Sequence, residues 1–186
     1  MEKRWEFYED DEEEINALAE AADISPFTSR LLLHRGVHTA QEAFLFLHPE
    51  EMPYHDPFLL SDMEKAVLRV IRAIEHNEKI VVYGDYDVDG VTATSLMLRF
   101  LRSLGATVDY YIPERLKEGY GLSQASLGQI LSEGAQLLIT VDCGITATEE
   151  AVFARNIGLD LVITDHHECR SGAIPDVCAV IDPKRP

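Results

Sequence analysis

The sequence predicts an α/β fold, in which a mainly parallel sheet carries helices on both faces and is preceded by a small helical N-terminal region. After Asn77, short apolar runs of strand length alternate with longer segments of helical periodicity. Before Asn77, only helical patterns and their start signals occur. Alternating strands and helices need right-handed crossovers, which make the strands parallel and cover both faces of the sheet. We therefore expect an acidic, helical region over residues 1–76 and an α/β domain over residues 77–186.

Helix-start signals divide the N-terminal region. Ser25-Pro26 is typical of an N-cap followed by a proline in the first turn. Residues 39–42, Thr-Ala-Gln-Glu, form a capping-box pattern that predicts a second short helix. Residues 61–64, Ser-Asp-Met-Glu, repeat this pattern before an amphipathic helix. The acidic run at residues 9–14 is expected to be a solvated, frayed face rather than a site.

The α/β region contains five candidate strands and the helices that connect them. The strands are predicted at residues 80–83, 107–112, 137–141, 159–164 and 177–181. The helices are predicted at residues 91–104, 123–132 and 146–156, the last opening with a capping box at residues 146–149. No internal repeat competes with this interpretation.

Composition excludes several classes of protein. The 186 residues carry a formal net charge of −17, which argues against duplex-DNA binding through a broad basic face, because neutralising phosphates requires lysine and arginine. The 46% of hydrophobic residues argue against general disorder. Cys143, Cys169 and Cys178 include no C-x-x-C pair and offer neither a disulfide framework nor a zinc knuckle. Without a signal peptide or an apolar run of about 18 residues, we expect a soluble cytoplasmic protein with no membrane partner.

Acidic and histidine side chains directly follow three of the predicted strands. They are Asp85, Asp87 and Asp89 after the first strand, Asp142 after the third, and Asp165-His166-His167 after the fourth. Because the carboxyl ends of parallel strands meet at one edge of a sheet, we expect these side chains to converge there. Carboxylates gathered in a partly buried site repel one another unless cations hold them. Carboxylate oxygens with imidazoles suit Mn²⁺ or Mg²⁺, and such a cluster has room for two ions about 4 Å apart.

Two other interpretations of the Asp85–Gly90 segment fit less well. A calcium-binding loop needs glutamate at its twelfth position, but counting from Asp85 gives Leu96, and a strand rather than a helix precedes the loop. The segment from Asp87 to Val91 also resembles the aspartate-nucleophile motif of haloacid-dehalogenase-type phosphatases. However, the strand predicted here ends before Gly84, slightly too early for that motif, and no pair of neighbouring acids follows at a later strand end. The two histidines would also have no role in such an enzyme.

Four ordered motifs resemble those of the DHH phosphoesterases. They are residues 84–92 (GDYDVDGVT), 118–122 (EGYGL), 141–145 (VDCGI) and 164–167 (TDHH). Residues 32–36 and 56–63 resemble the N-terminal region of the family's single-strand-specific exonucleases. The similarity covers almost the whole chain from about Ile24 onward.

The resemblance implies hydrolysis of single-stranded DNA from the 5′ end, with release of 5′-mononucleotides by two-metal activation of water. It implies Mn²⁺ or Mg²⁺ as cofactor, single-stranded DNA as partner, and an association with DNA-repair proteins. The implied metal ligands are Asp85, Asp87, Asp89, Asp142 and His166, with Asp142 bridging two ions. The implied catalytic residues are Asp142, His166, His167 near the scissile phosphate, and Asp165 orienting its neighbours. Arg115, Gly119, Tyr120 and Gly121 would steady the nucleic-acid strand.

Other functions remain open at this point. Similar chains continue into a further acidic motif and a second domain, so we expect this sequence to be an N-terminal catalytic half whose activity depends on the rest. Members of the same family act on short oligonucleotides or cyclic dinucleotides. A DHH fold that has become a non-catalytic binding module is the third alternative, although the intact Asp87, Asp89, Asp142 and His166 argue against it. The sequence does not indicate an oligomeric state.

Overall fold

The computed structural model describes residues 9–114, 119, 121–169 and 173–185. Contacts divide the chain into two compact units, one up to His55 and the other from Asp56 onward. Within the described ranges, no helix has the length and apolar character needed to cross a membrane. Each unit is considered separately.

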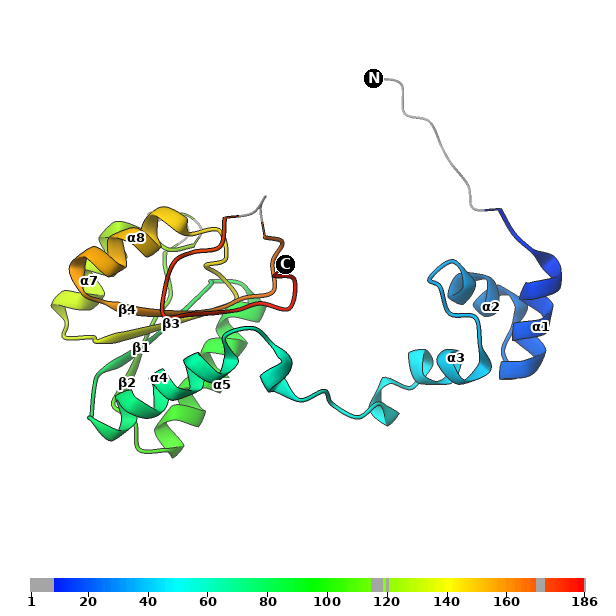
Figure 1. Cartoon of the computed structure of the whole chain (residues 1–186), viewed down its shortest axis with the longest axis horizontal. Coiled ribbons are helices and arrows are strands. Elements are labelled where there is room, and N and C mark those ends of the chain that lie inside the picture. The colour runs from blue at the N-terminus through cyan, green and yellow to red at the C-terminus, as the bar shows by residue number, and fades with distance from the viewer. Residues whose placement is uncertain (1–8, 115–118, 120, 170–172, 186) are drawn as a thin grey trace, which may run out of the picture. The chain divides into compact units, whose positions relative to one another are not determined.

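The first unit contains three short helices, and their start signals are local. Helices α1, α2 and α3 span Glu12–Ala22, Pro26–Leu33 and Ala40–Leu47, and a 3₁₀ turn follows at Pro49–Glu51 (Figure 1). The Ser25 hydroxyl caps α2, and the predicted capping box of Thr39 and Glu42 caps α3. Leu18, Leu32 and Ala43 form the centre of the small core.

Helix α1 was not predicted, because the acidic run was interpreted only as a solvated face. The Asp11 carboxylate accepts hydrogen bonds from the backbone N–H groups of Glu13 and Glu14 and caps the helix. The three glutamates of the first turn are exposed, and their charge favours the positive end of the helix dipole. The signal was present in the sequence as an N-cap before Ile15, Leu18 and Ala19.

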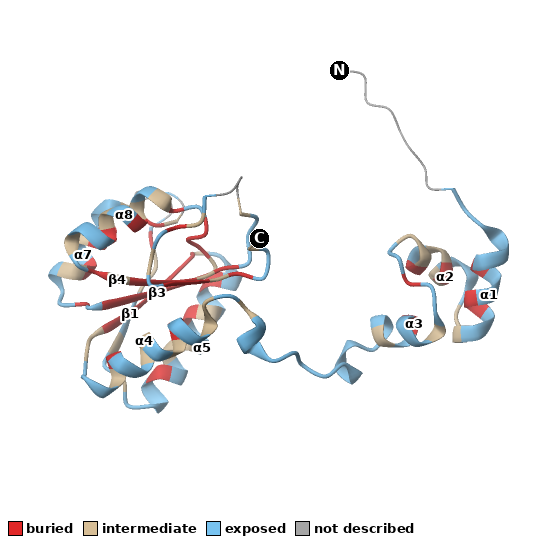
Figure 2. Cartoon of the chain, viewed as in Figure 1, coloured by how far each residue is buried: buried red, intermediate tan, exposed pale blue. Residues whose placement is uncertain are grey.

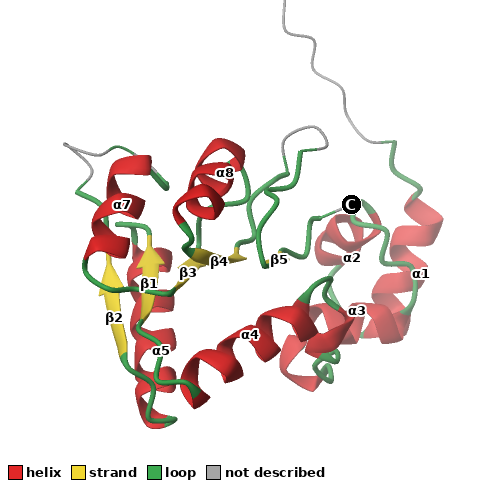
Figure 3. Cartoon of the chain, turned by 60° about the vertical axis from the view of Figure 1, so that its left-hand side comes forward, coloured by secondary structure: helices red, strands yellow, loops and turns green. Residues whose placement is uncertain are grey.

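The second unit is built on a five-stranded, fully parallel sheet, as the sequence predicts. Its strands are β1 (Ile80–Gly84), β2 (Val108–Tyr111), β3 (Leu137–Val141), β4 (Asp160–Thr164) and β5 (Ala179–Ile181). They lie in the order β2-β1-β3-β4-β5, and every neighbouring pair is parallel. Figure 3 shows β1 and β2 running side by side in the same direction. Strands β1 and β3 are buried along their whole length, which explains their continuous apolar runs.

Helices cover both faces of this sheet. Helices α4 (Met63–Glu75) and α5 (Val88–Ser103) lie on one face, and α7 (Gln124–Ser132) and α8 (Thr148–Ile157) lie on the other (Figure 1). Alternate residues of one strand serve the two cores: Val82 packs with the α4 and α5 side, and Tyr83 with the α7 and α8 side. In Figure 2 the strands are buried and the outer faces of these helices are exposed. The predicted α/β class is confirmed.

Two predicted capping patterns differ from the structure, and α5 begins at Val88 rather than at the predicted residue 91. At α4, Asp62 occupies the N-cap position in the left-handed region, with φ +60°, and makes no capping bond. Its carboxylate instead binds Lys65 and Arg185. At α8 the cap position is Ala147, not Thr146, because the Ala147 N–H bonds the Gly144 carbonyl at 2.9 Å. In both cases a tertiary contact or turn replaces the local capping pattern.

The two units meet at residues 55 and 56 in the structure, whereas the sequence suggests a boundary after residue 76, and helix α4 accounts for this difference. The sequence places this helix in a region that ends at residue 76, whereas its contacts place it in the unit that starts at Asp56. Ala66 and Ala73 pack in the same core as Ile80 of β1. An amphipathic stripe shows that a helix is buried on one side, but it does not show against which element.

Candidate metal centre

The sheet order creates a crevice between β1 and β3. From β1 the chain passes through α5 to β2 on one side, and from β3 through α8 to β4 on the other, so the two connections leave in opposite directions and on opposite faces. Ligands of open α/β sheets bind at such a point, outside the carboxyl ends of the strands. Gly84 and Val141 pair in register at this edge. The residues that follow them, Asp85 and Asp142, therefore emerge side by side.

The first group of candidate ligands is Asp85, Asp87 and Asp142. One carboxylate oxygen from each lies within 4.8 Å of the others. Asp85 is only 4% exposed, and within the described residues its Oδ1 is buried without a hydrogen-bond partner. A buried carboxylate oxygen without a partner costs free energy unless a cation binds it. This group therefore fits a metal ion.

Asp87 lies in the turn after β1, and its side chain is fixed by hydrogen bonds to the first turn of α5. Oδ1 of Asp87 accepts hydrogen bonds from the backbone N–H groups of Asp89 and Gly90, both at 3.0 Å, and so caps the helix. These bonds, with the one from Gly90 foremost, lower the pKa of Asp87. A Cβ atom on Gly90 would lie 2.4 Å from the carbonyl oxygen of Asp85, so only glycine permits this close approach. The start of α5 thus fixes the positions of Asp85 and Asp87 relative to each other.

The second group is Asp142, Asp165, His166 and His167, whose ligand atoms also lie within 4.8 Å of one another. His166 Nε2 is 2.8 Å from Oδ1 of Asp142. Asp142 therefore belongs to both groups. Imidazole and carboxylate donors in this ratio suit Mn²⁺ and Mg²⁺ better than a thiophilic metal.

Asp142 is held in an unfavourable environment for its charge. Its side chain is 7% exposed, and its backbone lies in the left-handed region with φ +60°. Burial raises the pKa of Asp142, and the charge of Asp87 raises it further, while the hydrogen bond with His166 lowers it. A carboxylate in this position is stabilised by any cation that binds between the two groups.

Asp165 is the centre of the histidine loop. Its side chain is 1% exposed. Oδ1 accepts hydrogen bonds from the backbone N–H groups of His166 and His167, and it lies 2.7 Å from Nδ1 of His167. Oδ2 accepts the N–H of Ile145 in the loop after β3. The hydrogen bond to Asp165 raises the pKa of His167. One buried carboxylate therefore joins the loops that follow β3 and β4.

A cavity of about 850 Å³ opens beside these loops. Its polar end is formed by Asp89, Asp142, Thr164, Asp165 and His166, and its apolar wall includes Leu96, Met97 and Phe100 of α5. Asp89 is exposed in the first turn of α5 and belongs to neither ligand group, although it lines the cavity. The structure thus brings Asp85 and Asp87 together with Asp142, and Asp142 together with His166, and it leaves Asp89 outside both groups as a lining residue of the cavity.

The predicted strand-binding residues are described only in part. Arg115 and Tyr120 lie outside the described residues. Gly119 and Gly121 have φ of +83° and +81°, a backbone region that favours glycine. The carbonyl of Gly121 accepts a hydrogen bond from the Tyr83 hydroxyl at 2.8 Å. This role of Tyr83 was not predicted, because its only signal in the sequence is a tyrosine at the end of an apolar strand.

Comparison with known proteins assigns the family. A sequence model described as "DHH family, N-terminal domain" matches residues 79–186. The chain belongs to the DHH family. This DHH match includes all five strands and every acidic residue of the site.

Relatives and solved structures of this DHH chain agree with the match. It is 47% identical over 183 residues to the single-stranded-DNA-specific exonuclease RecJ of Bacillus subtilis strain 168, covering 98% of the chain and 23% of the relative. A crystal structure of exonuclease RecJ bound to manganese superimposes with a TM-score of 0.63 at 35% identity, covering 70% of the chain and 33% of that structure. RecJ from Thermus thermophilus in complex with Mn²⁺ gives a TM-score of 0.66 at 27% identity, over 92% of the chain and 23% of that structure. The chain spans about a quarter of the length of the curated relatives it matches.

Proposed function

We propose that this chain forms the metal-binding part of a nuclease that hydrolyses single-stranded DNA from the 5′ end and releases 5′-mononucleotides. The observation that carries the proposal is the pair of ligand groups sharing Asp142. Among the described residues, no lysine or arginine forms an ion pair with the carboxylates of either group; the ion pairs there come from His166 and His167. The relatives are named single-stranded-DNA-specific exonucleases, and this supports single-stranded DNA as the substrate.

Mn²⁺ or Mg²⁺ is the proposed cofactor, as in the solved structures of RecJ. Asp85, Asp87 and Asp142 would hold one ion, and Asp142 with His166 would hold a second. Asp89 would join from the rim of the cavity. Bound divalent ions would supply Lewis-acid stabilisation of the phosphate and a lowered pKa for an attacking water.

The remaining residues of the site have positioning and electrostatic roles in this proposal. Asp165 fixes the backbone of both histidines through their N–H groups, so it orients His166 toward Asp142. Asp165 also raises the pKa of His167, which favours the imidazolium form. A positive ring beside the carboxylates would attract the scissile phosphate. Arg115, Gly119, Tyr120 and Gly121 would contact the strand near the crevice.

The charge of the chain favours a single strand over a duplex. With a formal net charge of −17, few cations are available to neutralise phosphates, so bound metal ions would provide much of the attraction for the reacting phosphate. A single strand can be drawn end-first into a crevice between two strand-end loops, whereas a duplex would need a broad basic face.

A chimera tests the proposal directly. Residues 1–186 would replace the corresponding part of the Bacillus subtilis relative, to which they are 47% identical. With Mn²⁺, we expect labelled 5′-mononucleotide as the first product from a linear single strand, and no cleavage of a circular one. Asp142→Ala should abolish the reaction, and Asp109→Ala, which removes an exposed aspartate on β2, should leave it intact.

Three results would contradict the proposal. Cleavage of the circular strand would indicate an endonuclease, and hydrolysis of cyclic dinucleotides with linear DNA left intact would indicate a different substrate. Equal activity of the chimera and its Asp142→Ala variant would show that the cluster is not the reaction centre.

A further inference from the structure

Tyr83 connects β1, which precedes the turn carrying Asp85 and Asp87, to Gly121. Its side chain is fully buried at the end of β1, two residues before Asp85. Its ring stacks on Tyr111 of β2, with ring centroids 5.2 Å apart. Its hydroxyl donates a hydrogen bond to the Gly121 carbonyl at 2.8 Å. A phenol buried on an apolar core is costly unless its hydroxyl is bonded, so this contact is a specific one.

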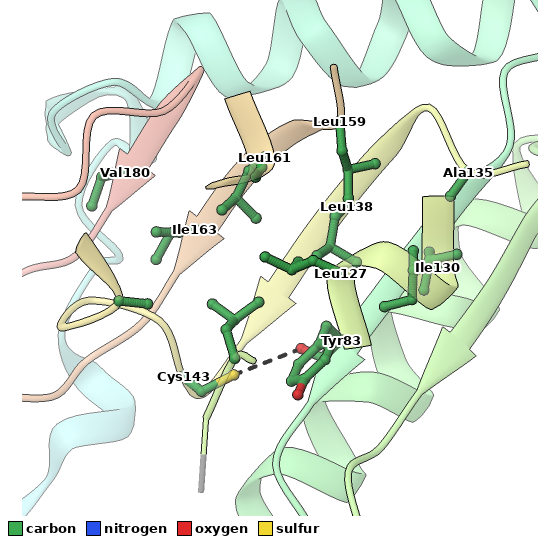
Figure 4. Close-up of a cluster of buried hydrophobic side chains, with 14 of the residues drawn as sticks. Tyr83, Leu127, Ile130, Ala135, Leu138, Cys143, Leu159, Leu161, Ile163 and Val180 are labelled. Carbon is green, nitrogen blue, oxygen red and sulfur yellow. Dashed lines mark hydrogen bonds between the residues drawn. The ribbon is translucent and has the colours of Figure 1, made fainter. Parts of the chain in front are cut away.

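The residue after Gly121 extends the connection to the second metal-binding loop. Leu122 is buried in the same core as Tyr83 and Cys143. Leu122 also lies near Gly144, since a Cβ atom added to Gly144 would be 3.4 Å from Leu122 Cδ1. Figure 4 shows Tyr83 and Cys143 side by side at the ends of their strands, joined by the weak contact between the Cys143 sulfur and the Tyr83 carbonyl. Residues 121 and 122 therefore lie against Tyr83, two positions before Asp85, and near Gly144, two positions after Asp142.

We propose that Tyr83 is a positioning residue for the DNA strand, whose hydroxyl fixes the backbone of Gly121 at a defined place relative to the metal centre. The inference rests on the proposed function, because it assumes that Gly121 contacts single-stranded DNA. Tyr83 itself belongs to neither ligand group. Its loss should weaken strand binding and leave metal binding unchanged.

Tyr83→Phe removes only the hydroxyl and retains the ring that stacks on Tyr111. The matched control is Tyr110→Phe, which removes a hydroxyl from an exposed tyrosine on the neighbouring strand. The measurements on this chain are the anisotropy of a fluorescent oligothymidylate with a 5′-phosphate at saturating Mn²⁺, calorimetric titration of Mn²⁺, and amide hydrogen exchange of residues 121–123. The hydroxyl that is removed contacts the Gly121 carbonyl at 2.8 Å and the Ser126 hydroxyl at 3.5 Å. For Tyr83→Phe we expect about fivefold weaker DNA binding, because the Gly121 backbone is held less firmly, together with faster exchange. Tyr110→Phe should match the wild type in DNA affinity, Mn²⁺ affinity and melting temperature.

The outcomes separate this inference from the proposed function. DNA affinity that Tyr83→Phe leaves unchanged overturns the positioning role alone. A parallel loss of Mn²⁺ affinity also overturns it, because Tyr83 would then act through the metal loops. A wild-type chain that binds Mn²⁺ and no single-stranded DNA contradicts the proposed strand contact itself, and the positioning role is rejected with it.

Discussion

The two edges of the sheet both gather carboxylates, but within the described residues only the amino edge pairs them with an arginine. At the amino edge, Arg69 of α4 lies 2.6 Å from Glu78, before β1, and 2.6 Å from Asp160 at the start of β4. The side chains of Arg69 and Glu78 are each 12% exposed. At the carboxyl edge, the side chains of Asp85, Asp142 and Asp165 are also largely buried, and among the described residues no lysine or arginine pairs with them.

The comparison distinguishes charged side chains that stabilise the fold by pairing with each other from charged side chains that are available to bind a ligand. At the amino edge the cation is part of the chain, so Arg69 pairs with both carboxylates when the protein folds. At the carboxyl edge the carboxylates repel one another, and burial and Asp87 together raise the pKa of Asp142. Like-charged groups kept together at a cost to stability are typical of functional sites. Four substitutions test this distinction.

The largest effect on stability is expected at the amino edge. Arg69→Met leaves Glu78 buried without its cation and should cost about 3 kcal/mol in the free energy of unfolding, measured with urea. Mn²⁺ affinity should not change, because the site lies at the opposite edge. In the double variant with Glu78→Gln, part of the loss should be recovered. A loss of Mn²⁺ affinity in Arg69→Met would show that the two edges are not independent.

At the carboxyl edge, removing a charge should have the opposite effect on the metal-free protein. Asp142→Asn should weaken Mn²⁺ binding at least about 100-fold in calorimetry, since it removes the ligand shared by both groups. Because the folded-state pKa of Asp142 is raised, its ionised form costs stability at neutral pH. The metal-free variant should therefore melt at the same temperature as the wild type or higher. Asp109→Asn is the control, and a variant that melts well below wild type without metal would contradict the distinction.

Asp62 tests whether a carboxylate stabilises the fold because it is paired with cations, rather than because of the edge of the sheet at which it lies. It contacts β5 but binds Lys65 and Arg185, and these contacts lower its pKa to about 2 from 3.8. A depressed pKa stabilises the fold above pH about 4, and this contribution disappears as the pH falls toward 2. Asp62→Asn, which tolerates the left-handed backbone, should cost about 2 kcal/mol at pH 7. Unfolding curves that differ as much at pH 2 as at pH 7 would refute this origin.

The smallest effect is expected at Gly90, where backbone proximity rather than charge shapes the site. In Gly90→Ala the new Cβ would lie 2.4 Å from the Asp85 carbonyl oxygen, so the first turn of α5 must shift and carry Asp87 with it. We expect about tenfold weaker Mn²⁺ binding, or about 1.4 kcal/mol. The control is Gly128→Ala in α7, where no atom lies within 4 Å and alanine should be neutral or slightly stabilising. Unchanged metal affinity in Gly90→Ala would show that the helix start does not set the ligand geometry.

Much of the fold was predictable because its signals are local. The predicted limits of β3 coincide with the observed strand, Leu137–Val141, since a buried strand between turns is one apolar run in the sequence. The caps of α2 and α3 were predicted for the same reason. The predicted caps of α4 and α8 were wrong, because Asp62 and Ala147 are engaged by contacts with residues that the local pattern does not include.

The candidate site was predictable as a set of residues but not as an arrangement. The position of Asp85, Asp142 and His166 after three strands predicted a common edge, since parallel strands end on the same side. The exclusion of Asp89 from both ligand groups depends on the direction of the first turn of α5, and the connections of Asp165 and Tyr83 to neighbouring loops depend on packing.

By itself, the sequence determined the parallel α/β class, the edge at which acidic residues gather and the kind of ion that they would bind. These follow from hydrophobic periodicity and from the chemistry of carboxylate and imidazole groups, which are properties of single residues and short segments. Only the tertiary structure decided that Asp142 is shared by two ligand groups, that Arg69 pairs with Glu78 and Asp160 at the opposite edge and that Tyr83 holds Gly121. Those depend on distances between residues far apart in the chain, which are fixed only when the strands pair and the helices pack.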